Sequence, residues 1–194
     1  MRLAGRLTLR SGEILGLAGR KGSGRRKLRI PGALAMNEHG LFDDLSVKDN
    51  LTMASLGRYG RFGLISPEVE LAAALDWMTK LNIHARSPWQ KVAELSGGDR
   101  QKVQLARLMM RGGSVLWLDE PTRGADPVSR LEIHGLVQEL AAEGHGILWI
   151  GDAAGELRGV CDTIALFRKG RVAEVRPAAQ WTESEIIAAT LGSL

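Results

Sequence analysis

The fold is decided by residues 95–126, which have the sequence LSGGDRQKVQLARLMMRGGSVLWLDEPTRGAD. A glycine-rich turn opens this stretch and leads into an amphipathic helix that should end at Gly112 and Gly113. An apolar run follows, which predicts a buried strand ending in two carboxylates. Asp126 is then placed to cap another helix, with Pro127 at its first position. Turn, helix and strand therefore follow one another within these 32 residues, and a second helix begins directly after them.

The sequence on either side continues this alternation. Residues 13–19 (EILGLAG) and 146–152 (GILWIGD) predict short buried strands, and residues 162–175 predict a hairpin that turns at Lys169-Gly170. Residues 66–83 predict a helix capped by Ser66, and residues 182–185 (TESE) form a capping box for a last helix. On the predicted helix at 66–83, the shared face comprises Leu71, Leu75, Met78 and Asn82. Alternating strands and helices predict an α/β fold with a mainly parallel sheet flanked by helices.

Composition excludes several classes of protein. The 194 residues are 44% hydrophobic and 25% charged, which suits a single soluble domain, and the net charge is 26 − 22 = +4. The single Cys161 excludes an internal disulfide and a cysteine metal cage. No apolar run is long enough to span a bilayer, and the N-terminus shows no secretory signal. We therefore expect any membrane association to go through a partner protein.

Three motifs in order carry a resemblance to a known family. Ser96–Arg107 follows the pattern SGG-x-x-Q-K-V-x-L-A-R, Leu118–Asp126 follows LDEPTRG-x-D, and Cys161-Asp162 precedes a strand. The chain resembles the ATP-binding cassette (ABC) ATPases, and most closely the second, degenerate cassette of simple-sugar importer ATPases. The resemblance implies a P-loop NTPase-like fold over residues 1–194, shortened after the phosphate loop, with a helical signature subdomain at about 64–111.

The two carboxylates at the end of the predicted strand suit metal-assisted chemistry. Asp119 would hold Mg²⁺, which prefers hard oxygen ligands. Glu120 would orient or deprotonate an attacking water. An isolated acidic strand end more often caps the following turn. The neighbouring motifs favour the catalytic interpretation here.

The signature residues Ser96, Gly97 and Gly98 form a turn at a helix N-terminus, where backbone N–H groups and the helix dipole suit a phosphate. The resemblance implies that they reach the nucleotide held on a partner cassette. It also implies that Gln101, Asp126 and Asp152 stand at nucleotide-contacting positions.

The phosphate loop departs from its pattern. Residues 19–26 (GRKGSGRR) keep Gly19, Gly22 and Gly24, but Arg25 and Arg26 stand where Lys and Ser/Thr are usual. Arg25 keeps the charge without the compact ammonium, and Arg26 has no lone pair to offer Mg²⁺. Two lost contacts of about 2 kcal/mol each would weaken binding roughly a thousandfold. Residual nucleotide contact and a plain basic glycine turn both remain open.

Further departures lie elsewhere in the chain. Pro31 should end the helix after the loop within a few residues. Glu38 falls near the position where the family has a Gln, and Asp152 replaces the family's switch His. The family's antiparallel subdomain is largely missing, and so is its adenine-stacking aromatic. We therefore expect a degenerate site that uses ATP and Mg²⁺ weakly or in trans, and hydrolysis by this chain itself is uncertain.

The resemblance implies a cassette of a carbohydrate importer, peripheral at the cytoplasmic face of the membrane. It would pair with a second ABC cassette, identical or different, and its helical subdomain would bind a membrane permease. The alternative is a non-hydrolysing pseudo-ATPase that binds nucleic acid or protein. That alternative rests on a basic cluster, for which a solvated face is favoured, so nucleic acid is not an expected partner. The cluster comprises Arg20, Lys21, Arg25, Arg26, Lys27 and Arg29.

Overall fold

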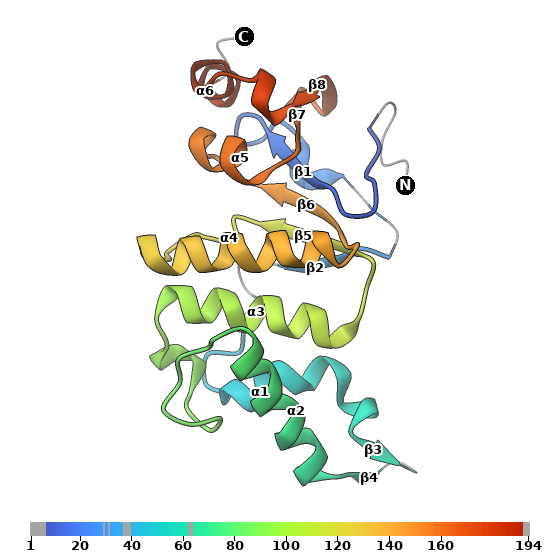
Figure 1. Ribbon diagram of the computed structural model, residues 1–194, viewed down its shortest axis with the longest axis vertical. Coiled ribbons are helices and arrows are strands. Elements are labelled where there is room, and N and C mark those ends of the chain that lie inside the picture. Colours follow the sequence, from blue (N-terminus) through green and yellow to red (C-terminus); the bar gives the residue numbers. More distant parts are fainter. Residues whose placement is uncertain (1–6, 29, 31, 37–39, 62–63, 192–194) are drawn as a thin grey trace. The chain divides into compact units, whose positions relative to one another are not determined.

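A computed structural model describes residues 7–28, 30, 32–36, 40–61 and 64–191 (Figure 1). The chain forms two compact units. The first comprises residues 1–35, 113–121 and 134–194, and the second comprises residues 36–112 and 122–133. The expected helical subdomain at 64–111 lies within the second unit.

The second unit is mainly helical. It contains α1 (Val47–Thr52), α2 (Pro67–Lys80) and α3 (Gly97–Arg111), the 3₁₀ turns η2 (Met53–Arg58) and η3 (Val92–Glu94), and the two-stranded antiparallel pair β3 (Gly60–Arg61) and β4 (Leu64–Ile65). Helix α4 (Pro127–Ala142) begins in this unit and ends in the first. Helices α2, α3 and α4 confirm the sequence-based expectation.

Helix α2 ends at Lys80, so Asn82, which the sequence placed on one helical face with Leu71, Leu75 and Met78, lies beyond it. Leu75 is exposed, whereas Glu70, Ala74 and Met78 are buried. Glu70 accepts a hydrogen bond of 2.5 Å from Thr52 Oγ1 and forms an ion pair of 2.9 Å with Lys48. A buried carboxylate is tolerated when it is paired in this way. The buried face of α2 therefore includes the charged residue Glu70.

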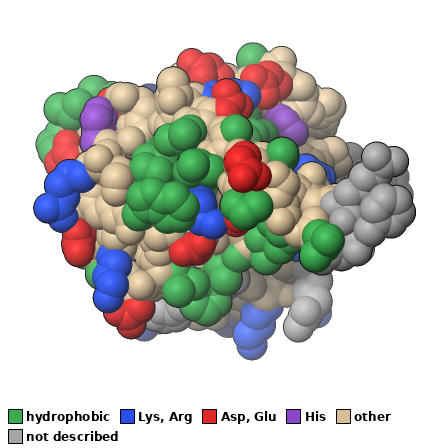
Figure 2. All heavy atoms as spheres, turned by 90° about the horizontal axis from the view of Figure 1, so that it is seen from below, with side chains coloured by type: hydrophobic (Ala, Val, Ile, Leu, Met, Phe, Trp, Pro, Cys, Tyr) green, Lys and Arg blue, Asp and Glu red, His purple; other side chains and the backbone are tan. Residues whose placement is uncertain are grey.

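Several large hydrophobic side chains remain on the surface of the second unit. Figure 2 shows a face on which hydrophobic side chains gather among charged ones. The exposed large hydrophobic residues of this unit are Phe42, Leu45, Leu64, Ile65, Val69, Leu75, Trp89, Val128 and Leu131. An apolar surface of this kind is typical of proteins that bind a partner.

The first unit is built around a six-stranded sheet in the order β2-β5-β6-β1-β7-β8. The strands are β1 (Ile14–Ala18), β2 (Leu34–Met36), β5 (Val115–Asp119), β6 (Gly146–Ile150), β7 (Thr163–Arg168) and β8 (Arg171–Pro177). Strand β1 pairs in parallel with β6 and β7, β5 pairs in parallel with β6, and β8 returns antiparallel to β7. The prediction of a mainly parallel sheet flanked by helices is confirmed.

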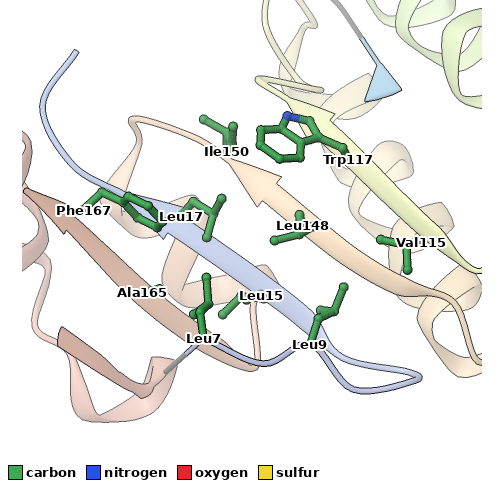
Figure 3. Packing of buried hydrophobic residues seen from close by; sticks show 10 residues of the cluster. All are labelled: Leu7, Leu9, Leu15, Leu17, Val115, Trp117, Leu148, Ile150, Ala165 and Phe167. Atoms are coloured by element: carbon green, nitrogen blue, oxygen red, sulfur yellow. The ribbon is translucent and has the colours of Figure 1, made fainter. Parts of the chain in front are cut away.

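The sheet is covered on both faces, because β1 and β6 are buried at every position. Figure 3 shows the cluster on one face, where Leu7 and Leu9 of the segment before β1 pack over Leu15, Leu17 and Leu148. The short helices α5 (Ala154–Val160) and α6 (Glu183–Leu191) contact β1. The core therefore surrounds the strand from which the phosphate loop emerges.

Local signals in the first unit are confirmed. Lys169 and Gly170 have φ of 47° and 78°, as a tight hairpin turn requires. Thr182 Oγ1 accepts from Glu185 N at 3.2 Å while Glu185 Oε2 accepts from Thr182 N at 2.7 Å, which forms the expected capping box. Within the described part of the chain, no helix is long and apolar enough to cross a membrane.

Candidate functional site

The phosphate loop leaves the carboxyl end of β1 and is shaped by its glycines. Gly24 has a φ of 95°, and a Cβ there would lie 2.7 Å from Gly170 Cα. A Cβ on Gly19 would lie 2.5 Å from the carbonyl oxygen of Phe167. Gly170 N donates to Ser23 O at 2.7 Å, which holds the loop against the β7–β8 turn. Only glycine fits these close approaches.

The helix that normally follows such a loop is reduced to the 3₁₀ turn η1 (Arg25–Lys27). This confirms the expectation from Pro31 that little helix could form. A cavity of about 140 Å³ remains beside the loop and is lined by Lys21, Gly22, Gly24, Arg25, Arg26 and Lys27. A second cavity of about 370 Å³ borders the same loop at Arg20–Ser23 and is also lined by residues of β7. Its volume falls within the range of ligand pockets, whereas that of the first lies below it.

Arg25 points into the protein. The residue is only 3% exposed, and its guanidinium forms an ion pair with Asp152. Arg25 Nη1 also donates to the carbonyl oxygen of Gly151 at 3.2 Å. Arg25 and Asp152 therefore satisfy each other, and the charge that the loop pattern offers to a phosphate is used inside the fold.

Arg26 binds both carboxylates at the end of β5. Its Nε lies 3.0 Å from Asp119 Oδ1 and 2.7 Å from Asp119 Oδ2, and its Nη2 donates to Glu120 Oε1 at 2.7 Å. The carboxylates raise the pKa of Arg26, with the hydrogen bond to Asp119 as the largest cause. Glu120 has a φ of 49°, an uncommon value outside glycine that often marks functional positions.

The carboxylate pair does not fit a magnesium ion in this arrangement. Mg²⁺ needs carboxylate oxygens that are open to it and an environment without a competing cation. Here a guanidinium contacts both oxygens of Asp119 and one oxygen of Glu120. A divalent cation at this position would also be repelled by the arginine.

The signature lies in the second unit, at the start of α3. Ser96 is the N-cap, because its Oγ accepts from Asp99 N at 3.1 Å. A Cβ on Gly97 would lie 2.1 Å from Gly124 O, and one on Gly98 would lie 2.3 Å from Ser129 Cβ. Both glycines therefore allow the start of α3 to pack closely against the turn at Gly124 and against Ser129 of α4.

Gln101 and Asp126 support the same region. Gln101 Nε2 donates to Arg123 O at 3.0 Å. Asp126 caps α4, because its Oδ1 accepts from Val128 N at 2.9 Å and from Ser129 N at 3.1 Å. The structure thus brings Ser96, Gly97, Gly98, Gln101 and Asp126 together around the starts of α3 and α4.

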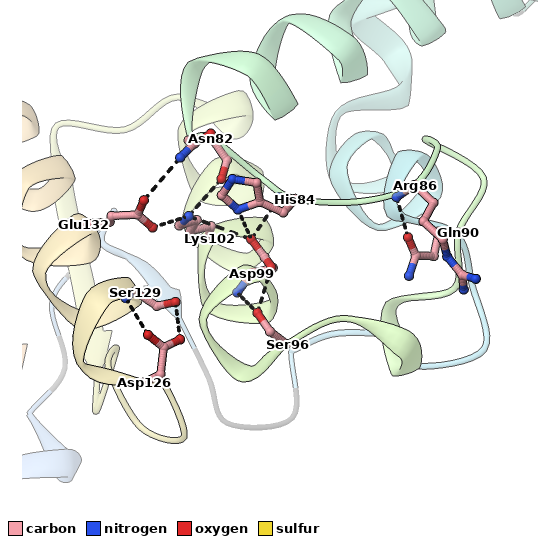
Figure 4. A network of polar contacts seen from close by, with 10 residues as sticks. All are labelled: Asn82, His84, Arg86, Gln90, Ser96, Asp99, Lys102, Asp126, Ser129 and Glu132. Carbon is pink, nitrogen blue, oxygen red and sulfur yellow. Dashed lines mark hydrogen bonds and ion pairs between the residues drawn. The ribbon is translucent and has the colours of Figure 1, made fainter.

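A buried lysine network next to the signature was not predicted from the sequence. Lys102 is 1% exposed, and its Nζ lies 2.6 Å from Glu132 Oε2 and donates to Asn82 O at 2.8 Å. Asp99 joins the network 3.8 Å from Lys102 Nζ and also accepts from Ser96 Oγ (Figure 4). This network fixes α3 to the start of α4.

Gly97→Ala should lower the free energy of unfolding by about 2 kcal/mol, because the new methyl group meets a backbone oxygen and forces α3 away from Gly124. Urea unfolding followed by circular dichroism measures this change. Gly159→Ala is the matched control, since nothing lies within 4 Å of a Cβ at that helical position. A loss at Gly97 no larger than at Gly159 would contradict the packing role.

The predicted site residues therefore form two groups. Gly19, Gly22, Gly24, Arg25, Arg26, Asp119, Glu120 and Asp152 belong to the first unit, and the signature group belongs to the second. Glu38 lies outside the described residues. In the basic cluster, Arg25 and Arg26 are engaged by carboxylates, and Arg29 lies outside the described residues. The cluster thus offers less free charge to nucleic acid than its sequence suggests.

The comparisons with known proteins agree with this architecture. The model of the ABC transporter family matches residues 25–123, just over half of the chain. The chain belongs to the ABC transporter family, as an ATP-binding cassette.

The chain is similar to curated proteins that are named ribose import ATP-binding proteins. Ribose import ATP-binding protein RbsA 2 of Burkholderia cenocepacia (strain HI2424) is 37% identical over 202 residues, covering 86% of this chain and 40% of its own length. RbsA of Pseudomonas putida (strain KT2440) is 34% identical over 221 residues, covering 96% of this chain and 43% of its own length. The chain therefore spans about two fifths of the length of these relatives.

Solved structures share the fold. A bacterial ABC transporter cassette solved as a dimer has a TM-score of 0.76 at 20% identity, over 90% of this chain and 89% of its own. The ATP-binding subunit of another ABC transporter has a TM-score of 0.71 at 19% identity, over 96% of this chain and 88% of its own.

Proposed function

We propose that this chain is a cassette of a carbohydrate importer that serves the nucleotide of a second, competent cassette and does not hydrolyse ATP at its own site. Ser96–Gly98 would contact the partner's nucleotide, and the pair would couple ATP binding and hydrolysis to transport. The chain would lie at the cytoplasmic face of the membrane, bound to a permease.

The observation that carries this proposal is the contrast between the two groups of site residues. In the first, Arg26 engages Asp119 and Glu120, the residues expected to hold metal and orient water. In the second, Ser96 caps α3 and is itself exposed, and the two residues that follow it carry no side chain. A helix N-terminus of this kind suits an anion brought by another molecule.

Two further findings support the transport role. The curated relatives are named as ribose import proteins. The second unit carries exposed hydrophobic side chains, among them Leu64 at 78% and Trp89 at 59% exposure, which suit contact with a permease.

The test measures ATP turnover of a competent cassette from one of the ribose-import relatives, mixed with this chain. Ser96→Arg should abolish the turnover that depends on this chain, because an arginine at the start of α3 fills the space meant for the partner's phosphate. This chain alone with Mg-ATP should show no turnover above background.

Thr182→Arg is the matched control. Like Ser96, Thr182 accepts a hydrogen bond from a backbone N–H at the start of a helix, and the substitution adds the same charge. Its effect should be limited to stability. The proposal is overturned if Ser96→Arg and Thr182→Arg give equal turnover, or if this chain alone hydrolyses ATP and loses that activity on Glu120→Gln.

A further inference from the structure

The carboxyl end of β5 carries two adjacent acidic residues and therefore needs a positive partner. Asp119 and Glu120 are both partly buried, with 21% and 23% of their side chains exposed. Two carboxylates so close together repel each other in a partly desolvated setting. In a metal-dependent site a divalent cation relieves that repulsion.

In this chain the positive partner is the side chain of Arg26. Arg26 forks across the pair, with Nε on Asp119 and Nη2 shared between Asp119 and Glu120. The N···O distances of 2.7–3.0 Å are those of charge-assisted hydrogen bonds. A planar guanidinium suits such forked binding better than an ammonium does.

Neighbouring residues of the phosphate loop hold Arg26 in this position. Gly24 packs against Gly170, and Arg25 is anchored by Asp152 and by the carbonyl oxygen of Gly151. The turn η1 then presents Arg26 to the end of β5. Because its neighbour is buried and paired, the backbone at Arg26 has little freedom to withdraw.

We propose that Arg26 takes the place of the divalent cation, so that the Asp119–Glu120 pair is closed to metal and one substitution opens it. This inference rests on the proposed function and deepens it. It explains why the chain's own site would not hydrolyse ATP. It concerns the chain's own residues and requires neither a partner cassette nor turnover.

The experiment titrates Mn²⁺ into the full chain without nucleotide and follows free Mn²⁺ by electron paramagnetic resonance. The wild type should bind no Mn²⁺ at this pair at concentrations up to about 1 mM. Arg26→Ser removes the cation and adds a hydroxyl ligand, so it should bind Mn²⁺ on the order of a hundredfold more tightly. Adding Asp119→Asn to Arg26→Ser should remove the gained binding.

Arg20→Ser is the matched control, because it removes the same charge from an exposed arginine of the same loop. It should leave Mn²⁺ binding at the wild-type level. Should Arg26→Ser fail to fold by circular dichroism, Arg26→Gln removes the charge but keeps a longer polar side chain with an amide donor, and should gain weaker binding.

Two outcomes would overturn the inference. One is wild-type binding of Mn²⁺ as tight as that of Arg26→Ser, with both lost on Asp119→Asn. The other is a folded Arg26→Ser and a folded Arg26→Gln that both bind no more Mn²⁺ than Arg20→Ser. Neither outcome depends on the Ser96→Arg turnover test, so the two proposals fail separately.

Discussion

Trp149→Ala should lower the free energy of unfolding by about 4 kcal/mol, within the range for large aromatic truncations in a core. Trp149 lies in β6 with 0% of its surface exposed. Its ring centroid is 5.6 Å from that of His134 in an edge-on arrangement. The truncation leaves a large cavity beside the sheet. Urea unfolding followed by far-ultraviolet circular dichroism gives the measurement.

Trp149→Phe separates the loss of volume from the loss of the indole N–H. Nε1 of Trp149 is buried and has no hydrogen-bond partner among the residues that the structure describes. Phenylalanine removes this unsatisfied group and keeps an aromatic ring, so the loss should be only about 1 kcal/mol. Equal losses for the alanine and phenylalanine variants would show that the cavity is not the cause.

Lys102→Ala should lower the free energy of unfolding by about 3 kcal/mol. The substitution leaves the carboxylate of Glu132 without its cation, which is unfavourable for a buried ion pair. It also removes the packed aliphatic part of the lysine side chain. Glu132 keeps 34% of its side chain exposed, so water relieves part of that penalty. A double-mutant cycle with Lys102→Met and Glu132→Gln isolates the pair's interaction energy from the packing term.

The same pair sets a pH dependence. The hydrogen bond from Lys102 is the largest cause of a lowered pKa for Glu132 in the folded protein, relative to 4.5. A lowered folded pKa means that the stabilisation is present above pH 4.5 and is lost as the pH falls below it. The stability difference between wild type and Glu132→Gln should therefore shrink below that pH. A difference that grows on acidification would contradict this assignment.

Local sequence signals predicted the elements well, because each is fixed by neighbours in the chain. The caps at Ser66, Ser96 and Thr182 and the turn at Lys169-Gly170 depend on residues two to four positions away, and all are present in the structure. The burial of Glu70 on α2 was not predicted, because its partners Lys48 and Thr52 come from another helix and meet it only after the chain has folded.

At the site, the sequence identified the unusual residues but not their contacts. Arg25 and Arg26 were seen as departures from a loop pattern, and Asp152 as a lost histidine. Their pairing joins residues 127 apart for Arg25 and Asp152, and 93 apart for Arg26 and Asp119. The sequence did contain a signal for these pairings. The predicted strands before the loop, before Asp119 and before Asp152 are parallel, so their carboxyl ends lie at one edge of the sheet and bring the opposite charges together.

The place of β1 in the sheet has a consequence for how the chain reaches its fold. Ile14 pairs with Ile147, and Leu15 pairs with Thr163, so the central strand finds both neighbours only when the last third of the chain is available. Such distant pairings are slow to form, because a long loop must close first. During synthesis, the apolar β1 segment therefore stays unpaired until β6 and β7 have been made, which leaves it open to binding by chaperones.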